Sequence, residues 1–267
     1  MNTKRLHLHN LLIIMALFIF GCEEPKTGSL DGSPTTTKIL GYSIVKTYPH
    51  DTAAYTQGLV MYKGGLYEGT GNYGRSELKK VDLSSGATLQ RVKLGEKFFG
   101  EGITILHDTI YQLTWQEKKV FVYVLPDLKK IKEFDVPFEG WGITHDGTNL
   151  IVSTGSGELF FYRPNDFSLL RTQQVMEAGA PSFNLNELEY IQGYIYANQY
   201  TYPYVLKIDP RSGEVVAKAD LTEWWNRNKS LYPKADVPNG IAFDSSTNKI
   251  YLTGKWWPEL YEIQFSN

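Results

Sequence analysis

The chain has 267 residues, with 27 basic and 29 acidic side chains and a formal net charge of −2 at pH 7. This near balance gives no support to nucleic-acid binding, which is usually marked by a basic face. The single cysteine cannot form an internal disulfide, so the fold is not a disulfide scaffold. The length is compatible with one closed all-β domain.

The first residues have the order of a secretory signal, in which a short basic start precedes an apolar run and a small residue. The apolar run, Leu11 to Phe20, is too short to span a bilayer comfortably. The word Ile19-Phe20-Gly21-Cys22 resembles a bacterial lipobox, which implies cleavage before Cys22 and attachment of lipid to it. An uncleaved anchor and a core helix are the alternatives.

We therefore predict a signal peptide over residues 1–21 and lipidation at Cys22. This places the protein in the cell envelope, at the outer membrane or the periplasmic face, in contact with the membrane only through its lipid. Residues 22–37 are rich in Glu, Pro, Lys, Gly, Ser, Asp and Thr, which fill no core, and we predict a flexible tether there. The folded domain is predicted over residues 38–267.

Five short words recur along this domain, with centres about 40 to 52 positions apart. They are Gln57-Gly58-Leu59, Glu101-Gly102-Ile103, Trp141-Gly142-Ile143, Glu187-Leu188-Glu189 and Asn239-Gly240-Ile241. Two further strand-like runs and a turn follow each word, and a fourth strand-like run closes the unit. Four short strands in a period of about 45 residues are typical of a β-propeller blade.

The fifth unit reaches Asn267 without a fourth strand, and a run near the start of the domain, Ile44 to Pro49, resembles the missing one. We predict that this N-terminal strand pairs with the last blade and closes the ring, which removes open sheet edges. The predicted fold class is all-β, a five-bladed propeller, with one short helix or turn over Leu221 to Asn226. A β-sandwich, which requires no fixed period, is the alternative.

In a propeller the first strand of each blade lines the central channel, and the loops that feed these strands form one rim. The five words therefore predict one pocket that collects Gln57, Glu101, Trp141, Glu187, Glu189 and Asn239. A channel that binds only water or an ion is the alternative. Glu187 and Glu189 alternate on a strand and point the same way. Calcium suits such an oxygen-only site, but two acids make no complete cage. We predict no required cofactor, with a structural channel ion left open.

Several familiar catalytic arrangements are missing from the sequence. The histidines of the predicted domain, His50, His107 and His145, have no paired spacing, so a histidine-based zinc site is not expected. The sequence has no Ser-His-Asp arrangement that can be defended, no phosphate loop, no dinucleotide fingerprint and no CxxC. Any catalysis is left to carboxylates, lysine and aromatic side chains.

Eight words occur in an order that matches one enzyme family. They are Tyr55-Thr56-Gln57-Gly58-Leu59, Gly71-Asn72-Tyr73-Gly74-Arg75-Ser76, Phe99-Gly100-Glu101-Gly102, Tyr111-Gln112-Leu113-Thr114-Trp115, Gly140-Trp141-Gly142, Asn186-Glu187-Leu188-Glu189-Tyr190, Asn239-Gly240-Ile241-Ala242 and Thr253-Gly254-Lys255 followed by Trp257-Pro258. Together they resemble the plant-type glutaminyl-peptide cyclotransferases over roughly residues 40–265. Two positions depart from the family pattern: Tyr200 stands where the family usually has Trp, and Tyr55 where Phe is common.

The resemblance implies a five-bladed, metal-independent enzyme that converts the N-terminal glutamine of peptides and proteins to pyroglutamate and releases ammonia. Its partners are then peptides or proteins with N-terminal glutamine, and the closed ring is expected to be a monomer. The α-amine attacks the side-chain amide of the same residue, and one carboxyl acting as general acid and base can move the proton to the leaving group. Glu101 is the expected catalytic residue, with a channel glutamate that holds an ion or a loop amide as the alternative.

Lys255 is the second expected catalytic residue, either stabilising the oxyanion or tuning Glu101; a surface lysine is the alternative. Its ammonium lowers the pKa of a nearby glutamate whereas burial raises it, and the sequence leaves the balance open. The predicted substrate-binding residues are Tyr55, Gln57, Phe99, Trp115, Trp141, Glu187, Asn186 and Tyr200. Core packing is the alternative for each aromatic residue.

Two other functions compete with this one. The first is a non-catalytic envelope propeller that binds peptides or proteins, because propellers host many unrelated functions. The second is a propeller hydrolase that acts on lactones or sugars with a metal in the channel, although the several Asp, Glu and Asn ligands expected in distinct blades are missing from the sequence.

Overall fold

The structure is a computed structural model that describes residue 1 and residues 36–266. The predicted lipidation site, Cys22, the signal peptide beyond its first residue and the tether up to residue 35 lie outside the described residues. Within the part that is described, no helix has the length and apolar character needed to cross a membrane.

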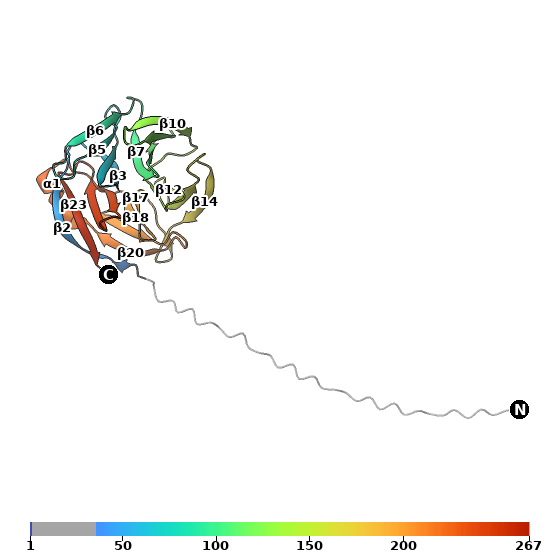
Figure 1. Cartoon of the computed structure of the whole chain (residues 1–267). Helices are drawn as coiled ribbons and strands as arrows, with labels where there is room; N and C mark the ends of the chain where they lie inside the picture. Colours follow the sequence, from blue (N-terminus) through green and yellow to red (C-terminus); the bar gives the residue numbers. More distant parts are fainter. Residues whose placement is uncertain (2–35, 267) are drawn as a thin grey trace. The chain divides into compact units, whose positions relative to one another are not determined.

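Five sheets, each with four antiparallel strands and one of them with a further short parallel strand at its edge, are arranged around a common axis, as Figure 1 shows. Blade 1 contains β3 (Thr56–Tyr62), β4 (Gly65–Thr70), β5 (Glu77–Val81) and β6 (Thr88–Lys93). Blade 2 contains β7 (Gly100–Leu106), β8 (Thr109–Thr114), β9 (Lys119–Val124) and β10 (Lys129–Asp135). Blade 3 contains β11 (Ile143–His145), β12 (Leu150–Ser153), β13 (Glu158–Tyr162) and β14 (Leu169–Gln174). The predicted period is thus confirmed for the first three blades.

The last two blades have the same order. Blade 4 contains β17 (Leu185–Ile191), β18 (Tyr194–Gln199), β19 (Tyr204–Ile208) and β20 (Val215–Asp220). Blade 5 contains β21 (Pro238–Asp244), β22 (Lys249–Gly254), β23 (Glu259–Ser266) and the N-terminal β2 (Gly41–Pro49). Because β2 pairs antiparallel with β23 along its whole length, from Gly41 opposite Ser266 to Pro49 opposite Glu259, the predicted closure of the ring is confirmed.

Burial follows the position of a strand in its blade. Every residue of the innermost strand β7 is buried, whereas the outermost strand β10 is almost entirely exposed. Between the blades, apolar side chains from both sheets pack together: Val60 and Leu78 of blade 1 share one cluster with Ile103 and Ile110 of blade 2. Each such fully buried aliphatic side chain stabilises the fold by about 1.5–3 kcal/mol.

The glycines of the recurring words have a steric reason. A Cβ added to Gly142 would lie 1.9 Å from the carbonyl oxygen of Asn186 in the next blade, and one added to Gly58 would lie 2.3 Å from the backbone nitrogen of Ile103. Neighbouring innermost strands therefore approach with their backbones almost in contact at the axis, which only glycine permits. This close approach places the residues beside each glycine at one end of the channel.

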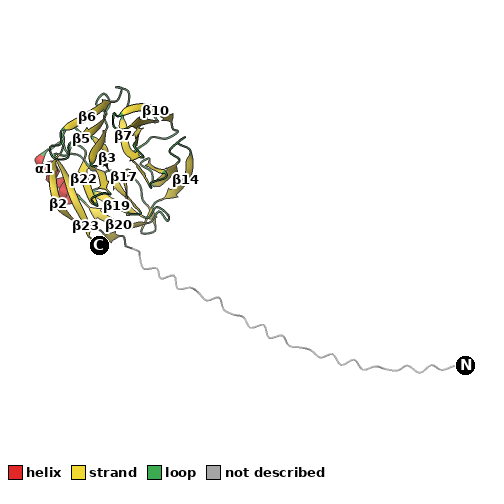
Figure 2. Cartoon of the chain, in the orientation of Figure 1, coloured by secondary structure: helices red, strands yellow, loops and turns green. Residues whose placement is uncertain are grey.

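Three short elements add to the predicted plan. The first is β1 (Lys38–Ile39), which pairs in parallel with β20 at the outer edge of blade 4. The second is a hairpin of β15 (Met176–Glu177) and β16 (Ala180–Pro181). The third is α1 (Thr222–Leu231), longer than the predicted helix, which lies at the outer edge of the ring (Figure 2) and buries Trp224 against Tyr261 with ring centroids 4.9 Å apart.

Candidate active site

A cavity of about 240 Å³ lies at the end of the channel where the innermost strands begin. Nine of the ten predicted catalytic and substrate-binding residues line it, together with one unpredicted residue, Asn72. The nine are Tyr55, Gln57, Phe99, Glu101, Trp115, Trp141, Asn186, Tyr200 and Lys255. They come from all five blades and the loops between them, so the cavity exists only once the ring has closed.

Glu101 is the second residue of β7, and only 4% of it is exposed. No donor among residues 36–266 forms a hydrogen bond with its carboxyl group, which lines the cavity. Burial raises the pKa of Glu101 well above its ordinary value, and the charge of Glu117 acts in the same direction, while Lys255 opposes them. Burial therefore outweighs the ammonium, which answers the question that the sequence left open, and it favours the protonated form of the carboxyl group more than water does.

Lys255 directly follows β22 and is buried, although it carries an amine. Its backbone is fixed on both sides, since its N–H donates to the carbonyl of Val237 and its carbonyl accepts from the N–H of Asp236. Burial lowers the pKa of the Lys255 ammonium to about 8, against the charges of Glu101 and Asp236, which raise it. Lys255 is therefore a buried lysine beside the cavity, and not the surface lysine that the sequence allowed.

The ammonium of Lys255 lies over two aromatic rings, 4.2 Å from the centroid of Tyr55 and 5.5 Å from that of Tyr200. It also donates a hydrogen bond to Oε1 of Gln57. The faces of aromatic rings attract cations, so these contacts hold the ammonium at one wall of the cavity without neutralising its charge. An ammonium carries three donors, and it can therefore serve a bound molecule as well as Gln57.

Two amide side chains offer further polar atoms to the cavity. Oε1 of Gln57 accepts from Lys255 and, at 3.3 Å, from Nδ2 of Asn239, so the free Nε2 of Gln57 is a donor toward the cavity. Oδ1 of Asn186 is buried and has no hydrogen-bond partner within residues 36–266. A buried polar atom without a partner is costly, so an acceptor beside the cavity is suited to a ligand donor.

Aromatic side chains form the remaining walls. The ring of Phe99 lies edge-on to Trp115 at 5.5 Å and to Tyr55 at 6.1 Å, and Trp141 lies edge-on to Tyr200 at 5.4 Å. Tyr200, which stands where Trp is usual, therefore still contributes an aromatic edge. Such walls exclude water from the polar groups between them and strengthen their interactions.

Phe99 is held by a residue that the sequence did not single out. Its N–H donates to Oε2 of Glu117 at 3.1 Å, and Oε1 of Glu117 accepts from the hydroxyl of Tyr73 at 3.0 Å. Glu117 thus orients one aromatic wall and raises the pKa of Glu101. Its position two residues after Trp115 was the only signal in the sequence. Asn72, by contrast, lay inside one of the family words.

Glu187, which was also predicted to bind substrate, does not line this cavity. Its two carboxylate oxygens accept hydrogen bonds from the backbone N–H groups of Leu59 at 3.2 Å and Ile241 at 2.9 Å. Glu189 is bound in the same manner by the N–H of Phe243 at 2.9 Å. Glu187 of blade 4 therefore binds blades 5 and 1, and Glu189 binds blade 5 and, through the hydroxyl of Thr144 at 3.3 Å, blade 3.

No site for a metal is evident among the described residues, which contain no group of three or more His, Cys, Asp or Glu side chains arranged to hold an ion. Asn239 forms its hydrogen bonds within the protein. Its Nδ2 donates to the carbonyl of Thr56 at 2.9 Å and to Oε1 of Gln57 at 3.3 Å. The chemistry that the cavity can perform is thus proton transfer by Glu101 beside a cation and amide groups, with water excluded.

Comparison with known proteins identifies the family. Residues 13–265 match the family described as glutamine cyclotransferase. The chain belongs to this family. A protein from Arabidopsis thaliana named glutaminyl-peptide cyclotransferase is 35% identical over 260 residues, which cover 95% of this chain and 81% of the relative.

A solved structure agrees with this membership. The crystal structure of Myxococcus xanthus glutaminyl cyclase matches with a TM-score of 0.81 and 34% identity, and the match covers 86% of this chain and 98% of that chain. The five-bladed ring is therefore the fold of a glutamine cyclotransferase family member, and the β-sandwich is excluded. Membership in this family makes the chain an enzyme of the transferase class.

Proposed function

We propose that the chain is a glutaminyl-peptide cyclotransferase, which converts the N-terminal glutamine of peptides and proteins to pyroglutamate and releases ammonia. One observation carries the proposal: a buried carboxyl group, Glu101, with a raised pKa and no donor of its own, lies in an aromatic cavity that also holds the ammonium of Lys255. The cavity, about 240 Å³, is smaller than the roughly 300–1,000 Å³ typical of sites for drug-sized ligands. That size suits a single terminal residue.

The reaction needs no external reactant. The lone pair of the α-amine attacks the side-chain amide carbon of the same residue, and a carbon–nitrogen bond forms that closes a five-membered lactam. One proton leaves the amine and joins the departing nitrogen, so that the original carbon–nitrogen bond breaks and ammonia is released. Attack requires the neutral amine, and an α-amine with an ordinary pKa near 8 is partly neutral at pH 7.

Glu101 is the group that moves this proton. As a carboxylate it accepts the proton from the attacking amine, and as a carboxylic acid it returns the proton to the leaving nitrogen. A pKa raised above the ordinary value makes the carboxylate a stronger base than an exposed glutamate, which favours uptake of the proton in general acid-base catalysis. No donor of residues 36–266 binds this carboxyl group, which keeps it available to the substrate.

The other polar groups divide the remaining tasks. The ammonium of Lys255 and the free Nε2 of Gln57 stabilise the negative charge that develops on the amide oxygen during attack. Oδ1 of Asn186 accepts a hydrogen bond from the α-amine and aims its lone pair at the amide carbon. The aromatic walls exclude water, so that the amide is attacked by the amine rather than hydrolysed.

Ammonia release from a short peptide with N-terminal glutamine, by the purified full-length chain, tests the proposal. We expect ammonia and loss of the free α-amine in equal amounts, and no product when the first residue is asparagine, whose shorter side chain cannot form this lactam ring. Activity that survives a metal chelator supports the proposal that no metal is required. A folded sample that releases no ammonia from several such peptides would favour the peptide-binding propeller instead.

We also propose that the enzyme acts as a monomer, lipid-anchored through Cys22 in the cell envelope. The order of the first 22 residues supports the anchor, and the closed ring needs no partner to cover its edges. Replacing Cys22 by Ala should move the protein from the membrane to the soluble fraction of the cells. An unchanged distribution would contradict the anchor, and a dimeric mass in light scattering would contradict the monomer.

A further inference from the structure

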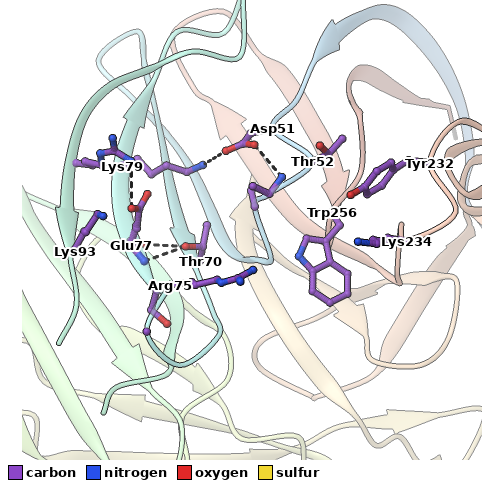
Figure 3. Close-up of a pocket in the computed structure, with 15 residues that line it drawn as sticks. Asp51, Thr52, Thr70, Arg75, Glu77, Lys79, Lys93, Tyr232, Lys234 and Trp256 are labelled. Atoms are coloured by element: carbon purple, nitrogen blue, oxygen red, sulfur yellow. Dashed lines mark hydrogen bonds and ion pairs between the residues drawn. The ribbon is translucent and has the colours of Figure 1, made fainter. Parts of the chain in front are cut away.

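A second and larger hollow, the basic groove, lies on the surface beside blade 1. It has a volume of about 740 Å³. Figure 3 draws the residues that line it, with Arg75 pointing toward Trp256 across the opening. Its lining includes five basic residues and one tryptophan, which are Arg75, Lys79, Arg91, Lys93, Lys234 and Trp256. The groove contributes no residue to the catalytic cavity, and the proposed chemistry leaves it without a role.

A wall one residue thick separates the groove from the cavity. At three places one residue lines the groove and a residue next to it, or two positions away, lines the cavity. The groove residues are Ala54, Gly74 and Trp256, and their respective neighbours in the cavity are Tyr55, Asn72 and Lys255. The first and third of these pairs are also bound to each other. The N–H of Trp256 donates to the carbonyl of Ala54 at 2.8 Å, and the rings of Trp256 and Tyr55 lie 4.7 Å apart.

The unpaired charge of the groove is positive. Its two carboxylates are occupied, since Asp51 pairs with Lys79 at 3.1 Å and Glu77 pairs with Arg91 at 3.4 Å. Three exposed cations, Arg75, Lys93 and Lys234, form no ion pair with any carboxylate of residues 36–266. Three free cations around one groove attract an anionic ligand and raise its local concentration.

The cavity holds only the first residue of a peptide, so the chain that follows must leave over one of its walls. Successive residues of an extended peptide advance by about 3.3–3.6 Å, which carries the second and later residues across a wall one residue thick. The other two hollows described for the ring share no wall of this kind, because none of their residues is adjacent in sequence to a residue of the cavity. The groove is therefore the surface that continues the cavity.

We propose that the basic groove binds the segment that follows the N-terminal glutamine and favours acidic side chains in that segment. This inference rests on the proposed cyclotransferase function, which it extends to the choice of substrate. Arg75 and Lys234 pair with substrate carboxylates, and the exposed face of Trp256 supports the peptide backbone between them. The preference is expressed in KM, since these contacts form equally in the ground state and the transition state.

Kinetics with two peptides of equal length test the inference, Gln-Ala-Asp-Glu-Ala and Gln-Ala-Lys-Lys-Ala, with glutamine amide as a substrate that does not reach the groove. We expect a higher kcat/KM for the acidic peptide through a lower KM, and a smaller difference at high salt, which screens exposed charges. Arg75→Gln and Lys234→Gln should each reduce the preference roughly two- to fivefold, the range of exposed ion pairs. Lys129→Gln, which removes an exposed lysine of β10, is the control for net charge.

Equal kcat/KM values for the two peptides would contradict the proposed role of the groove and leave the proposed function intact. The same holds if Lys129→Gln reduced the preference as much as Arg75→Gln and Lys234→Gln do. If the folded enzyme turned over none of the three substrates, the proposed function would fail instead. In that case equilibrium binding of the same two peptides, followed by tryptophan fluorescence, would still test whether the groove prefers acidic segments. Tighter binding of the acidic peptide that is weakened by Arg75→Gln supports it, and equal binding contradicts it.

Discussion

Two groups of buried acids occupy the channel at different depths, and they have opposite surroundings. Glu187, deep in the ring, has both carboxylate oxygens occupied by backbone N–H groups. Glu189 has one oxygen occupied by a backbone N–H and the other by the hydroxyl of Thr144. Glu101, at the mouth, has no donor among the described residues. Burial raises the pKa of all three, to about 8 for Glu189. A raised pKa therefore does not single out a catalytic carboxyl, whereas free hydrogen-bonding capacity does.

The largest effect is expected at the mouth of the channel. Glu101→Gln keeps the size of the side chain but removes the acid and base, so kcat should fall by roughly 10²–10⁴-fold. Circular dichroism and the melting temperature should remain those of the wild type, because no hydrogen bond within the described part of the chain involves this carboxyl group. A variant with near-normal kcat would show that another group transfers the proton.

Lys255→Met removes the cation from the same cavity while it fills a similar volume. We expect kcat to fall by roughly 10²–10³-fold, the loss typical when one donor to a developing oxyanion is removed. Lys255→Arg keeps the charge and is the matched control. If both variants lost the same activity, the geometry of the lysine rather than its charge would be the cause.

Replacing the acids deep in the channel should lower the stability of the fold rather than the rate of the reaction. Glu187→Ala leaves the N–H groups of Leu59 and Ile241 buried without acceptors, which should lower the free energy of unfolding by about 2–4 kcal/mol. Urea unfolding measures the loss, and the kcat of the remaining folded fraction should change little. A tenfold loss of kcat without loss of stability would instead show that Glu187 takes part in catalysis or substrate binding.

The last prediction concerns the pH dependence of stability. Because burial raises the folded-state pKa of Glu189 to about 8, above its ordinary value of 4.5, the folded state binds a proton that the unfolded state has lost between these values. The stability from this group is full below pH about 4.5 and is lost as pH rises toward 8, by at most about 1.4 kcal/mol per pH unit. Glu189→Gln should flatten this slope, and an unchanged slope would contradict the raised pKa.

Much of the fold could be predicted from the sequence because repetition is a property of the sequence itself. The five words and the unpaired final unit were enough to predict the blade number and the closing strand, which β2 and β23 confirm. The pairing of β1 with β20 could not be predicted, since two residues carry no periodicity.

The candidate site was predictable to the extent that its residues lie on innermost strands or within the family words. The position of Glu187 outside the cavity could not be predicted, because alternation along a strand indicates which way a side chain points but not how deep in the channel it lies. Glu117 was missed because its role depends on a loop that brings its carboxylate to the N–H of Phe99, a contact with no pattern in the sequence.

Chemical rescue tests most directly whether Glu101 is the proton-transferring group. Glu101→Ala leaves a space beside the substrate that a small carboxylic acid such as formate can enter. We predict that formate restores a substantial part of the lost ammonia release in Glu101→Ala, in a saturable manner, and does nothing for Lys255→Met. If Glu101→Ala stays folded and binds the peptide but no concentration of formate restores turnover, the account of Glu101 as the acid and base is contradicted.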